Sequence, residues 1–371
     1  MPLTLADILQ EHFPSYAQQN RAQLTAAHYR AARRVLSCRT PAMGGRVYSC
    51  TGCTKKHYAY HSCNHRSCPR CGARDQALWS AKQESRLLPV PYYMVTFTVP
   101  AELRSCFLAF PREAYSALLR ESARALQDII ATKYSGAEIG MTSVLHTWGR
   151  QVQHHPHVHI IVPAVCLDRL TGTAIHPKKA DAFLVHYRPL AARFRTRLRR
   201  ALQQVQGLEL SLEARACLSN TKPWNVQLKP VGTGKTALRY LARYVQKSAF
   251  SQKRLLGYDA RGNIRLQWTC SNTGKVSVLH LHPHEFIRRW LLHVLPKGLA
   301  RIRHYGYLSS AAKKARHILR ASLQKTGHLN RLSEPAPILP ELPNHCCTHC
   351  GSQLKLLRRI IAPRPPPMWK L

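Results

Sequence analysis

The sequence predicts an α+β fold, in which an antiparallel sheet with packed helices follows a cysteine-rich ribbon and precedes a basic C-terminal region. Runs of β-branched and aromatic residues bounded by Pro or Gly predict strands at 92–99, 140–148 and 157–165. Helices are expected at 1–37, 101–132, 189–206 and 235–249. Residues 38–75 are rich in Cys, His and Gly and show little periodicity, which sets them apart as a separate element.

The chain of 371 residues is long enough for two or three domains, and it is strongly basic. Its 56 Lys and Arg residues face 17 Asp and Glu residues, a formal net charge of +39. Such an excess repels itself unless a polyanion neutralises it, and basic residues along the whole chain favour nucleic acid as that polyanion. Because no apolar stretch could span a membrane and residues 1–30 do not resemble a signal peptide, we expect a cytoplasmic protein without a membrane partner.

Thirteen cysteines in a reducing compartment favour metal ligands over disulfides. Two Cys-x-x-Cys pairs separated by fourteen residues predict one four-sulfur zinc site, with the ligands Cys50, Cys53, Cys68 and Cys71. A redox dithiol is the alternative, but the thioredoxin-like βαβ context is missing. A second ion remains open, with candidate ligands Cys38, His57, His61, Cys63 and His65. A third pair in the tail, Cys347 and Cys350, supplies half a zinc site, and His345 and His349 are candidates to complete it.

The motif His157-Val158-His159 begins a predicted strand. Residues two apart in a strand face the same side, so both imidazoles point one way while Val158 points into the core. Two neutral imidazoles on a rigid strand supply two thirds of a divalent-metal site, which suits the polarisation of a phosphate. The third ligand stays open among Gln153, Gln227 and Gln246. Taken alone, the motif also fits a pair of surface histidines.

Two tyrosines, Tyr240 and Tyr244, share one face of the predicted helix at 235–249. A tyrosine can attack a phosphodiester and hold the 5′-phosphate as an ester while a 3′-hydroxyl leaves. The neighbouring cations suit phosphate or DNA binding: Arg239, Arg243 and Lys247. Core aromatics are the alternative interpretation, but the histidine pair and the net charge favour catalysis.

Further blocks occur in the same order as in one known family: Leu88–Pro100, Leu145–Gly149, His155–His159, Tyr240–Tyr244, Phe286–Gly298 and Arg301–Gly306. With the Cys50–Cys71 region, they make nearly the whole chain resemble the two-tyrosine rolling-circle transposases of the insertion sequence 91 family, in the HUH superfamily. Many relatives carry Arg where Lys247 stands and a Thr-His pair where Val245 and Gln246 stand. Tyr244-x-x-Lys247 is instead similar to replication initiators of the same superfamily.

The resemblance implies an HUH-type sheet in which the His157 strand lies beside the 92–99 strand and the tyrosine helix packs across the sheet. It implies structural Zn²⁺, a catalytic Mg²⁺ or Mn²⁺ at the histidines, and no nucleotide cofactor. The implied partners are single-stranded element ends and target DNA, with the host replication machinery as a further candidate, in the bacterial cytoplasm at the nucleoid. One tyrosine would nick an element end, and the other would act at the target or the second end.

These expectations divide the chain into five segments. An N-terminal helical region at 1–37 is followed by a zinc-binding ribbon at 38–87 and an HUH catalytic domain with the tyrosine helix at 88–255. A basic C-terminal DNA-binding region at 256–333 and a Pro-rich tail with one Cys-x-x-Cys pair at 334–371 complete the chain.

The expected function is that of a transposase that nicks and rejoins single-stranded DNA through a phosphotyrosine. A replication initiator with the same chemistry is one alternative, although the chain has no Gly-x-x-x-x-Gly-Lys-Ser/Thr loop. A non-catalytic zinc-containing DNA-binding protein is the other, and it would not need the histidines and tyrosines.

Overall fold

The computed structural model describes residues 2–84, 86–177, 186–219, 224–236, 238, 241, 248–270, 273–325 and 346–362. The chain forms two compact units, and each is assembled from segments that are distant in the sequence. The first unit comprises Met1–Asp75, Gln246–Val294 and Leu339–Leu371, and the second comprises Gln76–Val245 and Leu295–Ile338. Both units therefore draw on several of the five consecutive segments described above.

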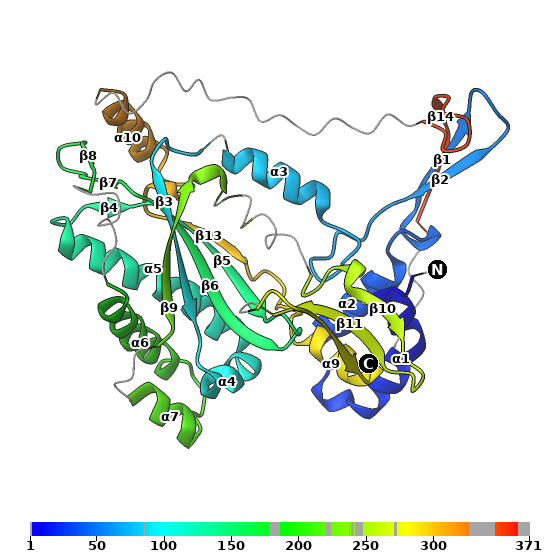
Figure 1. Ribbon diagram of the computed structural model, residues 1–371, viewed down its shortest axis with the longest axis horizontal. Helices are drawn as coiled ribbons and strands as arrows, with labels where there is room; N and C mark the ends of the chain where they lie inside the picture. The colour runs from blue at the N-terminus through cyan, green and yellow to red at the C-terminus, as the bar shows by residue number, and fades with distance from the viewer. Residues whose placement is uncertain are drawn as a thin grey trace. The chain divides into compact units, whose positions relative to one another are not determined.

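A five-stranded antiparallel sheet lies at the centre of the second unit (Figure 1), in the order β13-β5-β6-β3-β9. Its strands are β3 (Pro91–Thr98), β5 (Met141–Trp148), β6 (His154–Pro163), β9 (Val226–Thr233) and β13 (Ile302–Tyr305). The strands predicted at 92–99, 140–148 and 157–165 correspond to β3, β5 and β6. The predicted pairing of the His157 strand with the 92–99 strand is confirmed, with His159 opposite Thr96. The α+β class with an antiparallel sheet and packed helices is thus confirmed.

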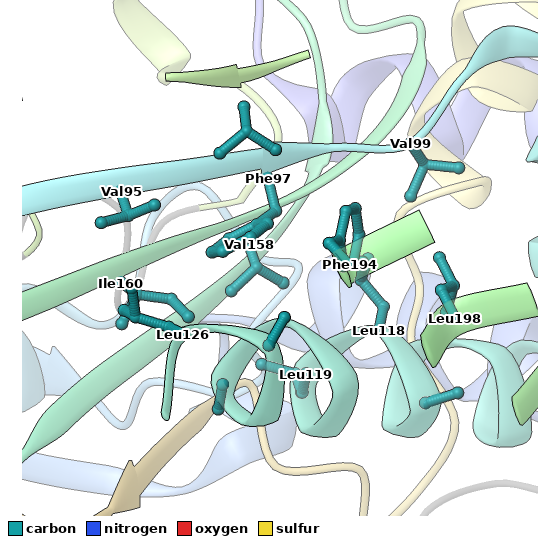
Figure 2. Close-up of a cluster of buried hydrophobic side chains, with 14 of the residues drawn as sticks. Val95, Phe97, Val99, Leu118, Leu119, Leu126, Val158, Ile160, Phe194 and Leu198 are labelled. Atoms are coloured by element: carbon teal, nitrogen blue, oxygen red, sulfur yellow. The ribbon is translucent and has the colours of Figure 1, made fainter. Parts of the chain in front are cut away.

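Helices pack against one face of this sheet and enclose the main core. They are α4 (Arg104–Ala109), α5 (Pro111–Lys133), α6 (Tyr187–Gln203) and α7 (Leu212–Ser219). Figure 2 shows alternate side chains of β3 and β6, such as Phe97 and Val158, pointing toward α5 and α6. Phe97 meets Phe194 edge to face, with ring centroids 4.8 Å apart. Because alternate residues point to opposite faces, His157 and His159 of β6 lie on the sheet face away from these helices.

A second apolar cluster covers part of that opposite face. Val144 of β5 and Ile161 of β6 are buried in it together with Leu241, and with Leu319 and Leu323 of α10 (Lys313–Lys325). A small sheet in the order β4-β7-β8 completes the second unit, formed by Glu138–Ile139, Cys166–Leu167 and Ala174–Ile175. The helix α3 spans Ala73–Glu84.

The first unit contains α1 (Leu5–Gln19), α2 (Ala26–Ser37) and α9 (Pro283–Leu291), so the helical region expected at 1–37 is two helices. Thr4 caps α1 by accepting a hydrogen bond from the Asp7 amide, which explains why the helix begins there. One sheet of the first unit is β10-β11-β12, with strands Leu255–Tyr258, Ile264–Thr269 and Val276–Leu281.

The other sheet of the first unit pairs an N-terminal hairpin with a strand from the C-terminal tail (Figure 1). Its order is β14-β1-β2, with strands Leu354–Ile360, Gly45–Cys50 and Lys56–Tyr60. β14 pairs antiparallel with β1 from Gly45 opposite Ile360 to Cys50 opposite Leu354. The tail pair of cysteines therefore belongs to the same small sheet as the first Cys-x-x-Cys pair.

Across the described residues, the structure contains no helix with the length and apolar character that crossing a membrane requires.

Candidate active site

Three histidines gather on the sheet face that the main helices leave uncovered. His157 and His159 come from β6, and His146 comes from the neighbouring β5, where it pairs with His157. One ring nitrogen from each lies within 4.8 Å of the others. The ring centroid of His146 is 4.5 Å from that of His159 and 5.0 Å from that of His157. The two histidines of the sequence motif thus share one face, as strand alternation predicts.

His146 is the histidine that the structure brings beside His157 and His159, where the sequence left a third candidate ligand open. Of the three glutamines considered for it, Gln153 accepts a hydrogen bond from the Gln151 amide in the β5–β6 loop, and Gln227 lies on β9, beyond β3 from the histidine strand. Gln246 falls outside the described residues. A signal for His146 was present in the sequence, because it is the single imidazole of the predicted strand that directly precedes the His-x-His strand. The sequence did not show, however, that the register would place it opposite His157.

The neighbouring histidines of β6 have different roles. His154 points to the helix side, where its Nε2 lies 2.8 Å from the hydroxyl of Tyr115 on α5. The Nδ1 of His155 lies 3.2 Å from an Arg104 guanidinium nitrogen. Among the described histidines of this strand, only His157 and His159 join His146 in the cluster.

Burial keeps all three clustered imidazoles neutral near pH 7. Desolvation lowers the pKa of His157 to about 4 and that of His159 to about 3. Burial also lowers the pKa of His146 well below its usual range, and His159, His157 and Arg301 add to this effect. The neutral ring is the form that binds metal, so the donor set fits a divalent ion.

A second layer of contacts holds these rings in place. Nδ1–H of His157 donates to the carbonyl oxygen of His155 at 2.7 Å, which leaves Nε2 for a ligand. Nδ1 of His159 lies 2.9 Å from Oγ1 of Thr96 on β3. Trp148 stacks on His146 with ring centroids 5.5 Å apart, and Arg301 covers Trp148 at 5.0 Å. The site is therefore built from three adjacent strands of one rigid sheet.

The predicted nucleophiles and their basic neighbours lie outside the described residues: Tyr240, Tyr244, Arg239, Arg243 and Lys247. Leu241, between the two tyrosines in the sequence, is among the described residues. Leu241 is fully buried in the apolar cluster that includes Val144 and Ile161. Val144 lies on the same face of β5 as His146, and Ile161 lies on the same face of β6 as His159. Leu241 thus packs on the sheet face that carries the histidines.

The cysteines of the first unit form two four-sulfur clusters. One contains Cys38, Cys63, Cys68 and Cys71, and the other contains Cys50, Cys53, Cys347 and Cys350. The predicted grouping of Cys50 and Cys53 with Cys68 and Cys71 is therefore wrong. Spacing along the chain identified the pairs, but the pairing of β14 with β1 decides which pairs meet.

The donor sets of both clusters fit a zinc ion. Sulfur atoms bound to one tetrahedral zinc lie about 3.8 Å apart, because each Zn–S bond is about 2.3 Å long. In the first cluster, Sγ of Cys71 is 3.2 Å from that of Cys38 and 3.5 Å from that of Cys63. Of the additional ligands considered for a second ion, Cys38 and Cys63 join this cluster, whereas the histidines considered with them do not.

Comparisons with known proteins identify relatives of the chain. The chain matches the model of a transposase zinc-binding domain over residues 8–99 and that of a putative transposase over residues 140–316. It is 33% identical over 360 residues to the putative transposase y4qJ of Sinorhizobium fredii, which covers 91% of this chain and 87% of the relative. It is 29% identical over 293 residues to the transposase for insertion sequence element IS801 of Pseudomonas savastanoi pv. phaseolicola, and this match covers 75% of this chain and 69% of the relative.

Among solved structures, the conjugative relaxase TrwC in complex with OriT DNA aligns with a TM-score of 0.26 and 15% identity, over 63% of this chain and 71% of that chain. TrwC complexed with a 27-mer DNA aligns with a TM-score of 0.28 and 16% identity, over 63% of this chain and 73% of that chain. The identity to the Sinorhizobium relative across most of both chains, together with the two domain matches, shows that the chain belongs to the insertion sequence 91 family of transposases and contains its zinc-binding domain.

Proposed function

We propose that the protein nicks and rejoins single-stranded DNA at the ends of its element, through a tyrosine nucleophile beside a metal held by His146, His157 and His159. The observation that carries this proposal is the cluster of three buried, neutral imidazoles on one face of a rigid sheet. Leu241, which lies between the two tyrosines in the sequence, packs against that same face and supports the proposal.

The imidazoles would hold Mg²⁺ or Mn²⁺, and such an ion, when bound, polarises the scissile phosphate and offsets the charge that develops on it. The three side chains bring no charge of their own, so the full positive charge of the ion acts on the DNA. His157 and His159 are oriented by the carbonyl of His155 and the hydroxyl of Thr96, which limits the reorganisation needed on binding.

The chemical step uses one of the two tyrosines. Tyr240 or Tyr244 loses its phenolic proton to water, and the oxygen attacks the phosphorus of a phosphodiester. The bond from phosphorus to the 3′-oxygen breaks, that oxygen takes up a proton, and the 5′-phosphate remains as a tyrosine ester. Rejoining is the reverse step, in which a 3′-hydroxyl attacks the ester and releases the tyrosine. Two tyrosines allow two such esters, one for an element end and one for the target or second end.

The surrounding charge would hold the DNA. We propose Arg239, Arg243 and Lys247 as phosphate contacts next to the tyrosines, because guanidinium and ammonium groups bind phosphate oxygens. The freed 3′-hydroxyl would prime synthesis by the host replication machinery, and the protein would act at the nucleoid. The transposase relatives support this function over a replication initiator or a non-catalytic DNA-binding protein.

The zinc-binding domain would be stabilised by Zn²⁺ at Cys38, Cys63, Cys68 and Cys71. Three of these cysteines are buried and the fourth is half-buried, so the four thiolates need a cation to be tolerated away from water. The Trp290 indole donates to the carbonyl oxygen of Ser67 at 3.1 Å, which fixes the loop that carries Cys68.

The test is a covalent-capture assay. Protein is mixed with a labelled single-stranded oligonucleotide carrying the element end and Mg²⁺ or Mn²⁺, and run on a denaturing gel. We expect a labelled band at the mass of the protein that is lost with chelator and in the Tyr240→Phe/Tyr244→Phe double variant. Tyr187→Phe, a change at an exposed tyrosine of α6, is the matched control and should keep the band. A band that persists in the double variant would exclude the assigned nucleophiles.

A further inference from the structure

We propose that a zinc ion bound by Cys50, Cys53, Cys347 and Cys350 fastens the C-terminal segment to the N-terminal ribbon. This site is separate from the histidine cluster and uses ligands from both ends of the chain. Its four Sγ atoms lie within 4.8 Å of one another. The inference does not depend on the nicking chemistry.

The sulfur positions fit a metal site better than disulfides. Sγ of Cys50 lies 3.3 Å from that of Cys350, and Sγ of Cys53 lies 3.8 Å from that of Cys347. A disulfide needs about 2.0 Å, whereas two ligands of one tetrahedral zinc are separated by about 3.8 Å. Cys346 is exposed and does not belong to the cluster, although it is adjacent to Cys347.

The backbone around the sulfurs has the form of two matched knuckles. The Gly52 amide lies 3.3 Å from Sγ of Cys50, so it stabilises a thiolate there. In the tail, the Cys347 amide donates to the Ser352 carbonyl at 2.7 Å, and Gly351 adopts a φ of +74° that only glycine adopts without strain. Each Cys-x-x-Cys pair therefore sits in a tight turn that directs both sulfurs to one point.

The two knuckles are also locked to each other. The Thr51 amide donates to the Gln353 carbonyl at 3.1 Å, and the Thr51 hydroxyl donates to the same oxygen at 2.9 Å. A Cβ on Gly52 would lie 2.2 Å from Oγ of Ser352, so only glycine allows this approach. His57 adds a contact, with Nε2 3.2 Å from Sγ of Cys347. All of these contacts join the N-terminal ribbon to the tail, so they form only when the two Cys-x-x-Cys turns meet.

In the sheet β14-β1-β2, Val47 and Tyr48 of β1 are buried, but neither β2 nor β14 contains a buried residue. On β14, Leu356 is 45% exposed and Leu357 is 53% exposed, and Tyr58 on β2 is 54% exposed. A small sheet that buries so few apolar side chains is marginal without another constraint. A zinc ion shared by ligands 300 positions apart supplies that constraint, so the docking of β14 on β1 should depend on the metal.

The first test counts thiolate-bound zinc in the full-length protein, by titration with an organomercurial and a colorimetric zinc indicator. This reagent releases zinc held by cysteine and ignores an ion held by histidines. We expect two equivalents per chain from the wild type and one from Cys347→Ser/Cys350→Ser. Cys50→Ser/Cys53→Ser should also give one, and so should the variant that combines all four changes. Cys346→Ser is the matched control and should keep two.

Either of two results would overturn the proposal. If Cys347→Ser/Cys350→Ser keeps two equivalents, the tail does not ligate zinc. If the fourfold variant loses more zinc than each pair variant, the two pairs serve different ions. The equivalent that remains at Cys38, Cys63, Cys68 and Cys71 reports that a variant is still folded.

A second measurement uses the wild type, so it does not depend on the folding of a variant. Graded chelation is followed by alkylation and mass spectrometry of each cysteine. Cys50, Cys53, Cys347 and Cys350 should become reactive together at one chelator concentration, while Cys346 reacts throughout. Loss of protection in two separate steps, one for each pair, would contradict a shared ion.

Discussion

The histidine cluster and the Cys50–Cys350 cluster are both candidate metal sites, but they are built in opposite ways. His146 and His159 are thirteen positions apart and lie on neighbouring strands above a large core. Cys50 and Cys350 are 300 positions apart and lie on turns at the end of a sheet with little core. The first site follows from packing and should exist without metal. The second site should cause the local fold, because its ligands meet only when the chain ends are joined.

The largest expected effect is the removal of zinc. Stripping the protein should remove several kcal/mol of stability from the first unit, since structural zinc contributes folding free energy directly. Hydrogen exchange should show lost protection in β1, β2 and β14, whereas β3, β5 and β6 stay protected. Equal loss of protection in β6 would contradict the view that the sheet with the histidine cluster folds independently of zinc.

The next effect concerns the histidine cluster. His146→Asn should lower the yield of covalent complex by at least about 100-fold, because a buried ligand is lost. The denaturation midpoint of the second unit should change little, since the sheet and its core remain. His304→Asn, the same change on the neighbouring β13, is the matched control, because His304 lies 3.0 Å from Thr142 Oγ1 and outside the cluster. A large loss of stability in His146→Asn would show that the site is not formed by packing alone.

An effect of medium size comes from acid. Burial lowers the pKa of His304 from 6.5 to about 4, and Arg86, Arg316 and Lys82 add to this shift. Between these two pH values the unfolded state binds the proton and the folded state does not, so stability should fall as the pH drops from about 6.5 to 4. His304→Asn should remove on the order of 2 kcal/mol of this loss. Denaturant titrations of both proteins at pH 7 and pH 4.5 measure the difference, and parallel pH curves would contradict the assignment.

The smallest effect tests the second layer of contacts. Thr96→Val keeps the shape of the side chain but removes the oxygen that lies 2.9 Å from Nδ1 of His159. We expect about a 10-fold weaker affinity for Mn²⁺, because such partners orient the ligand ring. Thr98→Val, the same change two residues along β3, is the control. Calorimetric titration with Mn²⁺ compares them, and equal affinities would remove Thr96 from the site.

The sequence by itself determined the features that depend on local pattern. The strands β3, β5 and β6, the shared face of His157 and His159, the three Cys-x-x-Cys pairs and the family resemblance were all readable, because side-chain alternation and turn chemistry act over a few residues. The net charge of +39 likewise needs no fold to be interpreted.

Only the tertiary structure decided which of these features meet. The register of β5 against β6 places His146 opposite His157, and a shift of one residue would turn it to the other face. The pairing of β14 with β1 divides the cysteines into two sets that differ from the predicted tetrad. Strand register and the closure of a chain 300 residues long depend on the packing of the whole unit, so no local pattern of cysteines or histidines could have specified them.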